Sequence, residues 1–218
     1  MPVYGRRCRV EPAALGEPEL LNRIVSAVRA VVPVDVPFTA KMRLGIDDTR
    51  LAIDCAQALA DGGIASLVVH ARTKDDGYRP PAHWEWIARI AEAVAVPVVA
   101  NGEVWTVEDW QRCRAVSGCD DVMIGRGAVA DPFLARRIKG AVDAQPSGDD
   151  WRALVPHIID YWEKMQQRTW APNAPGRLKL LLSYFRRTWP EAIALYAAVR
   201  PLREPAEVTR VLAEERER

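Results

Sequence analysis

SLVVH at residues 66–70 is a short apolar run that holds two adjacent valines and ends in a histidine. Short runs rich in β-branched residues are typical of strands buried on both faces of a parallel sheet. Three further segments share this character: PFTAKMR at Pro37–Arg43, PVVAN at Pro97–Asn101 and DVMIG at Asp121–Gly125. The sequence therefore predicts four buried parallel strands.

Helical patterns separate these strands. They are expected at Glu19–Val31, Thr49–Asp61, His83–Ala95 and Val107–Val116, with Asp48 or Thr49 as the N-cap of the second helix. Alternating strands and helices form βα units, whose right-handed crossovers build either a doubly wound sheet or a (β/α)8 barrel. Only four units are visible. A barrel would therefore lack its first half, and the fold class expected is α/β, the second half of a TIM barrel.

The alternation of predicted strands and helices ends at about Gly140. A polar linker at Gln145–Asp150 leads into a region with helical periodicity and no predicted strand. One apolar stripe holds Trp151, Leu154, Ile158, Trp162 and Met165, and a second holds Leu178, Leu181, Leu182 and Phe185. We expect a partial barrel over residues 1–144 and a small helical bundle of three or four helices over residues 145–218.

Length and composition indicate a soluble globular protein. The 218 residues are 49% hydrophobic, which is enough to bury a real core. No stretch approaches the roughly 18 unbroken apolar residues that a membrane span needs, and no signal peptide is visible, so a cytoplasmic protein is expected. The four cysteines have spacings that match no metal site, so we expect reduced thiols and no bound metal.

Charge is distributed unevenly along the chain. Residues 1–150 carry 18 Lys and Arg against 21 Asp and Glu, whereas residues 151–218 carry 12 against 8. A basic tail suits contact with a polyanion such as a nucleic acid. A solvated helical surface often has the same bias, so charge alone leaves both interpretations open.

Polar residues stand at the ends of the predicted strands. They are Lys41, His70, the Asn101-Gly102-Glu103 segment and the Gly125-Arg126-Gly127 segment. Barrel enzymes place their sites at the carboxyl ends of the strands. Glycine-flanked backbone amides and the Arg126 guanidinium suit a phosphate, so a phosphorylated cofactor or sugar is the expected ligand.

Simpler explanations exist for each of these residues. Lys41 could pair with Glu103, His70 could bond a neighbour, and Asn101-Gly102 could be only a turn. Lys41 and Arg43 share one strand face, and a lysine that faces a barrel interior needs an anionic or carbonyl partner. A ligand oxygen would supply that partner.

Several segments together resemble a known family. KMRLGIDD at Lys41–Asp48, VVHARTKDDGY at Val68–Tyr78, PVVANGEVW at Pro97–Trp105 and SGCDDVMIGRGAVADPFL at Ser117–Leu134 are similar, in order and spacing, to signature blocks of the tRNA-dihydrouridine synthases. RLKLLLSYFRR at Arg177–Arg187 and YAAVR at Tyr196–Arg200 resemble the C-type bacterial subfamily, which modifies position 16 of the tRNA D-loop. The resemblance covers roughly residues 12 to 212.

The resemblance implies a fold, cofactors and a partner. The family has an FMN-binding (β/α)8 barrel followed by a helical tRNA-binding domain, and it reduces uridine to 5,6-dihydrouridine with NADPH as electron donor. Carried over by position, Lys41 would contact the flavin ring. His70, Asn101, Gly102, Glu103, Gly125 and Arg126 would hold the ribityl phosphate, and Tyr78, Arg177, Lys179, Tyr184 and Arg200 would contact tRNA.

One family element is absent from the sequence. The resemblance implies an N-x-G-C-P segment, whose cysteine protonates uracil, ahead of the helix that Leu15–Pro33 matches, and no such segment occurs. Cys8 lacks the following proline, so no catalytic residue is assigned. We expect an N-terminally truncated barrel whose open edge favours self-association. The alternatives are an inactive tRNA-binding remnant and another phosphate-binding barrel enzyme.

Overall fold

The computed structural model describes residues 15–168 and 173–217. Its first part alternates helices and strands: α1 (Pro18–Val31), β1 (Thr39–Arg43), α2 (Ala52–Asp61), β2 (Ser66–His70), α3 (Trp84–Ala93), β3 (Val98–Asn101), α4 (Val107–Ser117) and β4 (Val122–Met123). Two short helices follow, α5 (Arg126–Ala130) and α6 (Leu134–Ile138). The remaining elements are α7 (Gly148–Arg168), α8 (Ala174–Phe185), α9 (Pro190–Val199) and α10 (Pro205–Arg216).

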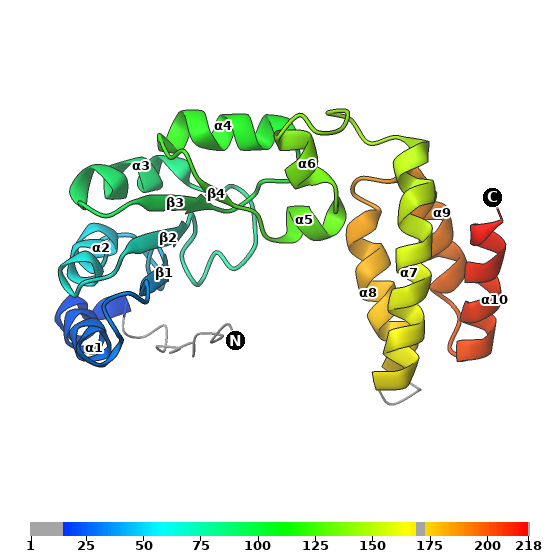
Figure 1. The fold of residues 1–218 in the computed structure, drawn as a ribbon, viewed down its shortest axis with the longest axis horizontal. Helices are drawn as coiled ribbons and strands as arrows, with labels where there is room; N and C mark the ends of the chain where they lie inside the picture. Colours follow the sequence, from blue (N-terminus) through cyan, green and yellow to red (C-terminus); the bar gives the residue numbers. More distant parts are fainter. Residues whose placement is uncertain (1–14, 169–172, 218) are drawn as a thin grey trace. The chain divides into compact units, whose positions relative to one another are not determined.

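The strands form one parallel sheet with the order β1-β2-β3-β4 (Figure 1). All three neighbouring pairs are parallel, which confirms the four predicted strands. A doubly wound sheet reverses its strand order at a switch point, whereas here each crossover advances one strand in the same direction. The observed order therefore fits a segment of a (β/α)8 barrel.

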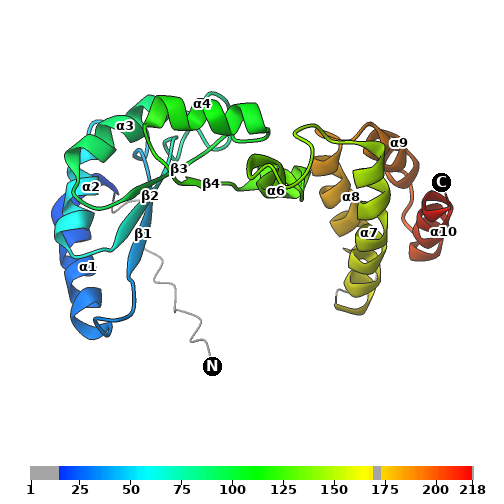
Figure 2. The same cartoon turned by 45° about the horizontal axis from the view of Figure 1, so that its top comes forward.

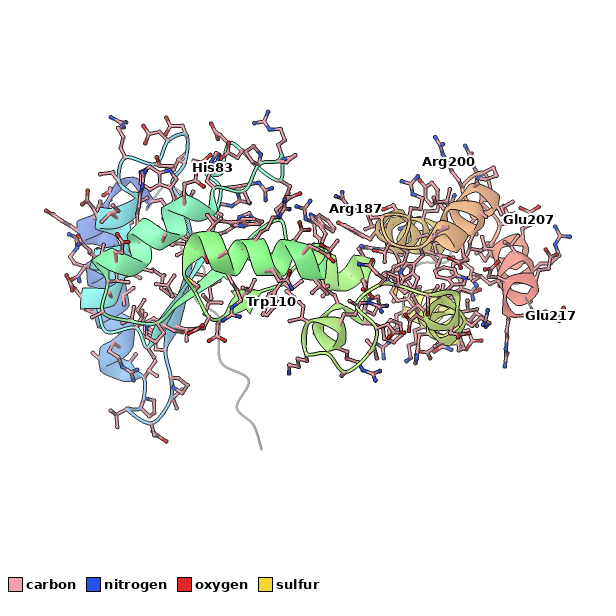
Figure 3. All side chains as sticks on the ribbon, turned by 90° about the horizontal axis from the view of Figure 1, so that it is seen from above. His83, Trp110, Arg187, Arg200, Glu207 and Glu217 are labelled. Atoms are coloured by element: carbon pink, nitrogen blue, oxygen red, sulfur yellow. The ribbon has the colours of Figure 1, made fainter. Side chains whose placement is uncertain are left out.

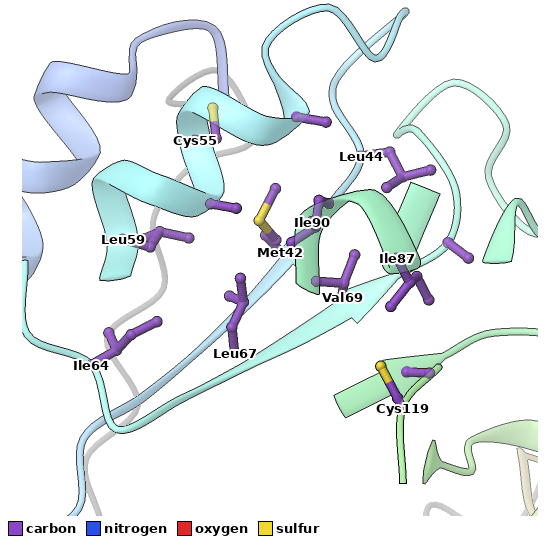
Figure 4. Close-up of a cluster of buried hydrophobic side chains, with 14 of the residues drawn as sticks. Met42, Leu44, Cys55, Leu59, Ile64, Leu67, Val69, Ile87, Ile90 and Cys119 are labelled. Atoms are coloured by element: carbon purple, nitrogen blue, oxygen red, sulfur yellow. The ribbon is translucent and has the colours of Figure 1, made fainter. Parts of the chain in front are cut away.

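Helices α1 to α4 lie along one side of the sheet (Figure 2). The strand side chains that point to this side include Met42, Leu67, Val69 and Ala100, all in the buried core. Figure 4 shows Met42, Leu67 and Val69 close to apolar side chains of the helices. Because side chains alternate along a strand, the residues between them point to the opposite side of the sheet. That second side carries the polar residues of interest.

The predicted N-cap of α2 is wrong. Leu51 occupies the N-cap position without a side-chain capping bond. The Asp48 carboxylate instead accepts a hydrogen bond from the Arg50 amide at 3.0 Å. Aspartate side chains readily bond the backbone two residues ahead, and this local turn competes with helix capping.

Three of the four cysteines lie in described parts of the chain, and they are free and buried. This confirms the expected reduced state for Cys55, Cys113 and Cys119, whereas Cys8 lies outside the described residues. Burial is the main cause that raises the pKa of the Cys55 and Cys113 thiols to about 11. These thiols therefore stay protonated at neutral pH.

The contacts divide the chain into two compact units. The first holds the residues up to Val104 together with Glu108–Gly125, and the second holds Trp105–Val107 together with Arg126–Arg218. Buried residues of α7 to α10 share a separate core, which includes Trp151, Leu154, Ile158, Trp162, Leu178, Leu182 and Phe185. The apolar stripes expected from the sequence contribute to this core. The domain boundary between residues 144 and 145 stays a prediction.

The predicted polar linker is organised by one buried arginine. Arg137, which is 3% exposed, donates to the carboxylates of Asp131 at 2.7 Å and Asp150 at 2.8 Å. It also donates to the backbone carbonyls of Asp143 at 2.7 Å and Gln145 at 3.0 Å. A single side chain thus fixes the path of the chain from α6 to the start of α7.

Candidate functional site

One row of side chains crosses the sheet at the carboxyl ends of the strands. In the strand register, Arg43 pairs with His70, His70 with Asn101, and Asn101 with Met123. Paired residues of neighbouring strands point to the same side, so the row lies on the side opposite the helix-packed core. The structure thus brings together three of the strand ends that the sequence singled out.

Lys41 stands two residues before Arg43, on the same side of the sheet. Its Nζ donates to the Asn101 side-chain oxygen at 2.6 Å and contacts the Met123 sulfur at 3.2 Å. The Asn101 amide nitrogen in turn donates to the Met123 carbonyl at 2.7 Å. Burial, with the nearby Arg43 charge, lowers the pKa of Lys41. An amide oxygen is therefore the internal partner of this cation.

Tyr78 lies beside the same row. The Arg43 guanidinium donates to the carbonyls of Thr73 at 2.6 Å and Gly77 at 3.1 Å, and it lies 5.5 Å from the centre of the Tyr78 ring. The Tyr78 and His70 ring centres are 6.2 Å apart. Tyr78 is 62% exposed. An expected RNA contact and an expected cofactor residue thus adjoin each other.

Arg72 is a site residue that sequence reasoning missed. It is 0% exposed, its Nε donates to the Arg79 carbonyl at 2.6 Å, and its Nη2 pairs with Glu103. Its Nη1 is buried and has no hydrogen-bond partner in the described residues. The alternative of a Lys41–Glu103 pair is wrong, because the Glu103 carboxylate is turned to Arg72. The sequence signal was the arginine in HARTKDDGY, two residues after His70.

The turn after β3 holds Glu103 in this position. Gly102 has φ +130° and Glu103 has φ +55°, the left-handed region that non-glycine residues rarely adopt. A Cβ at Gly102 would lie 3.3 Å from the His70 ring. The Trp84 indole donates to the Gly102 carbonyl at 2.9 Å. The chain thus turns at Gly102, directly after Asn101 ends β3. This turn brings the Glu103 carboxylate to the buried Arg72.

The GRG segment spans the division between the units. Gly125 ends the first unit and Arg126 begins α5 in the second. The Arg126 guanidinium lies 5.0 Å from the centre of the Trp105 ring. Stacking on an indole restricts the orientation of a guanidinium. The Trp105 ring therefore restricts the orientation of the Arg126 guanidinium.

The remaining expected RNA contacts lie on α8 and α9. Arg177, Lys179 and Tyr184 belong to α8, and Arg200 follows the last residue of α9. Arg177 and Arg200 are exposed, whereas Lys179 is half-buried and donates to the Leu202 carbonyl at 2.6 Å. Figure 3 shows Arg187 and Arg200 at the ends of α8 and α9, and Glu207 and Glu217 on or next to α10.

In residues 15–168 and 173–217, no cluster of His, Cys, Asp and Glu could hold a metal ion. Within the same ranges, no helix has the length and apolar character needed to cross a membrane.

Comparison with known proteins gives a consistent result. The sequence profile described as dihydrouridine synthase (Dus) matches residues 10–179. The chain is 63% identical over 198 residues to the tRNA-dihydrouridine(16) synthase of Cupriavidus necator, covering 91% of this chain and 62% of that protein. Against the proteins of the same name from Ralstonia nicotianae and Aquipseudomonas alcaligenes, the identities are 63% and 53%, over 91% of this chain in both cases and 61% and 64% of those proteins. The chain thus spans roughly three fifths of the length of these relatives.

Proposed function

Because the chain belongs to the dihydrouridine synthase family, we propose that it forms part of an FMN-dependent enzyme that reduces uridine to 5,6-dihydrouridine in tRNA. The proposed target is position 16 of the D-loop, the proposed electron donor is NADPH, and the proposed compartment is the cytoplasm. The names of the relatives support the position of the uridine. The observation that carries the proposal is the Lys41–Asn101 pair at the carboxyl ends of the strands.

The polar row fits a flat ligand rich in oxygen and nitrogen. The Lys41 ammonium has three donors, and its contacts with Asn101 and Met123 leave one for a ligand oxygen. The buried Arg72 Nη1, which has no partner among the described residues, is a further hydrogen-bond donor of the same unit. When bound, the flavin supplies the hydride. Lys41 would stabilise negative charge on the reduced ring, and His70, Asn101, Gly102 and Glu103 would shape the cofactor's surroundings.

The phosphate of the cofactor is assigned to Gly125 and Arg126. A Cβ at Gly125 would meet nothing within 4 Å, so the backbone there is open to a ligand. Arg126 offers a planar fork that can bond two phosphate oxygens, and Trp105 supports its guanidinium.

The helical region, proposed as residues 145–218, is assigned to tRNA. Arg177, Lys179 and Arg200 supply positive charge, while Tyr184, and Tyr78 from the barrel region, supply rings for stacking. The proposed flavin part covers residues 1–144.

The flavin absorbance of the purified chain tests this proposal first. Retained flavin, identified as FMN after release, would support the site. NADPH-dependent formation of dihydrouridine in an unmodified tRNA transcript would then establish the reaction. A colourless, folded protein that takes up no added FMN would refute the flavin assignment.

A second candidate is a tRNA-binding protein without catalysis. It is favoured by the exposed Arg177 of α8 and the exposed Arg200 that follows α9. Salt-sensitive tRNA binding without turnover, in a chain supplied with FMN and NADPH, would identify this function.

A further inference from the structure

The segment from α8 to the start of α10 is unusually cationic. Residues 174–204 contain six Lys and Arg residues and two acidic residues, Glu191 and Glu204. Helix α10, by contrast, carries Glu207, Glu214 and Glu215 against two arginines. The positive charge of this segment therefore lies on α8 and on the connections that follow α8 and α9.

Two adjacent arginines of this segment stack on aromatic rings. Arg186 and Arg187 follow α8 directly, and both are exposed. The Arg186 guanidinium lies 4.0 Å from the centre of the Tyr196 ring, and the Arg187 guanidinium lies 3.8 Å from the centre of the Trp105 ring. Neither guanidinium has a carboxylate partner within the described parts of the chain. Each is held by an aromatic ring and not by a countercharge.

This arrangement differs from that of three exposed arginines elsewhere in the chain. Arg50, Arg112 and Arg152 pair with aspartates close by in the sequence, which neutralise them. A ring leaves the charge intact and restricts the side chain, so less conformational entropy is lost when an anion binds. The N–H edge of a stacked guanidinium stays open to two phosphate oxygens. Such a guanidinium is preorganised for phosphate binding.

We propose that Arg186 and Arg187 bind phosphates of the tRNA backbone, with Tyr196 and Trp105 as the residues that position them. The proposal rests on the proposed function for its ligand, and it adds two contacts that the family resemblance did not assign. Adjacent cations held on separate rings suit a repeating polyanion. The excess of six cations over two acidic residues favours RNA over a protein partner.

The test is the affinity of the full chain for an unmodified tRNA transcript at several salt concentrations. We expect Arg186→Gln and Arg187→Gln each to weaken binding roughly fivefold to tenfold near physiological salt and to lower the log–log salt slope by about one. Arg210→Gln is the matched control, because Arg210 is an exposed arginine on the acidic helix α10. It should leave affinity within about twofold.

Two substitutions of Tyr196 separate positioning from charge. Tyr196→Phe keeps the ring under Arg186 and should bind like the wild type. Tyr196→Leu keeps every charge but removes the ring, and it should weaken binding roughly threefold while circular dichroism shows that the chain is still folded.

The outcomes are distinguishable. Wild-type affinity and salt slope in both glutamine variants, or an equal loss in Arg210→Gln, would overturn the inference while leaving tRNA binding in place. A wild-type chain that does not bind tRNA at all would overturn the proposed function and the inference together.

Discussion

Lys41 combines a cation with a neutral internal partner. Among the described residues its polar partners are an amide oxygen and a thioether sulfur, and no carboxylate neutralises it. A carboxylate partner would have occupied the ammonium and made it a structural ion pair. The observed pairing leaves the positive charge available to a ligand, which is why the flavin proposal centres on this residue.

Lys41→Met should lower flavin affinity roughly tenfold to a hundredfold, because it removes a charge-assisted hydrogen bond worth about 1.5–3 kcal/mol. Equilibrium titration with FMN measures this effect. Lys74→Met, which changes an exposed lysine of the same unit, is the control and should bind FMN normally. Because burial lowers the pKa of Lys41 below 10.5, affinity should decline with rising pH sooner than for an ordinary lysine. Normal affinity in Lys41→Met would remove this residue from the cofactor site.

The buried thiols predict a loss of stability at high pH. An unfolded thiol has a pKa of 9.0, whereas those of Cys55 and Cys113 are raised to about 11. Between these values the folded chain binds more protons than the unfolded chain, so stability falls as pH rises through this window. The loss should reach roughly 2 kcal/mol per thiol, measured by urea unfolding. A Cys55→Ala, Cys113→Ala double variant should lack this part of the decline, and an identical decline would contradict the assignment.

At the scale of elements, Arg137 joins α6, the following linker and α7 through two carboxylates and two carbonyls. Removing it would leave Asp131, which is 3% exposed, as an unpaired buried charge. We expect Arg137→Ala to destabilise the helical unit by roughly 3–5 kcal/mol in chemical unfolding. Arg136→Ala, an exposed neighbour on the same helix, should change stability by less than about 0.5 kcal/mol. Similar effects of the two substitutions would show that the buried network adds little.

The strands and most helices were predictable because their signals are local. Apolar β-branched runs and 3.6-residue periodicity depend only on neighbours in the sequence. The predicted N-cap of α2 was wrong because an aspartate can either cap a helix or bond the backbone two residues ahead. In the structure, Asp48 accepts a hydrogen bond from the Arg50 amide, and Leu51 is the N-cap. β4 is shorter than expected, at Val122–Met123, and in the described structure it pairs only with β3.

The site was only partly predictable for a different reason. Lys41, His70 and Asn101 stood out because polar residues at strand ends are uncommon without a use. Arg72 did not, since its importance comes from burial and from a pairing with Glu103, 31 residues away. Likewise, the stacking of Arg187 on Trp105 joins residues that are distant in sequence. Such contacts are set by the tertiary fold, and no local pattern encodes them.

At the scale of the molecule, the sheet has two strands with one neighbour each. Among the described residues, β1 pairs only with β2 and β4 only with β3. The side of the sheet opposite the helices exposes Thr39, Lys41 and Met123. Unpaired strand edges beside a partly apolar face promote pairing with another chain.

A polypeptide of these 218 residues should therefore self-associate, with a mass by light scattering that rises with concentration during size-exclusion chromatography. Thr39→Lys adds a charge at the exposed start of β1, which discourages edge pairing, and should shift the equilibrium towards the monomer. Gln57→Lys adds the same charge to an exposed position of α2, on the helix-covered side, and should leave the mass unchanged. Circular dichroism would show that each variant is folded. A wild-type chain that stays monomeric at every concentration, with bound FMN, would show that the edges need no partner and that these residues suffice for the cofactor site.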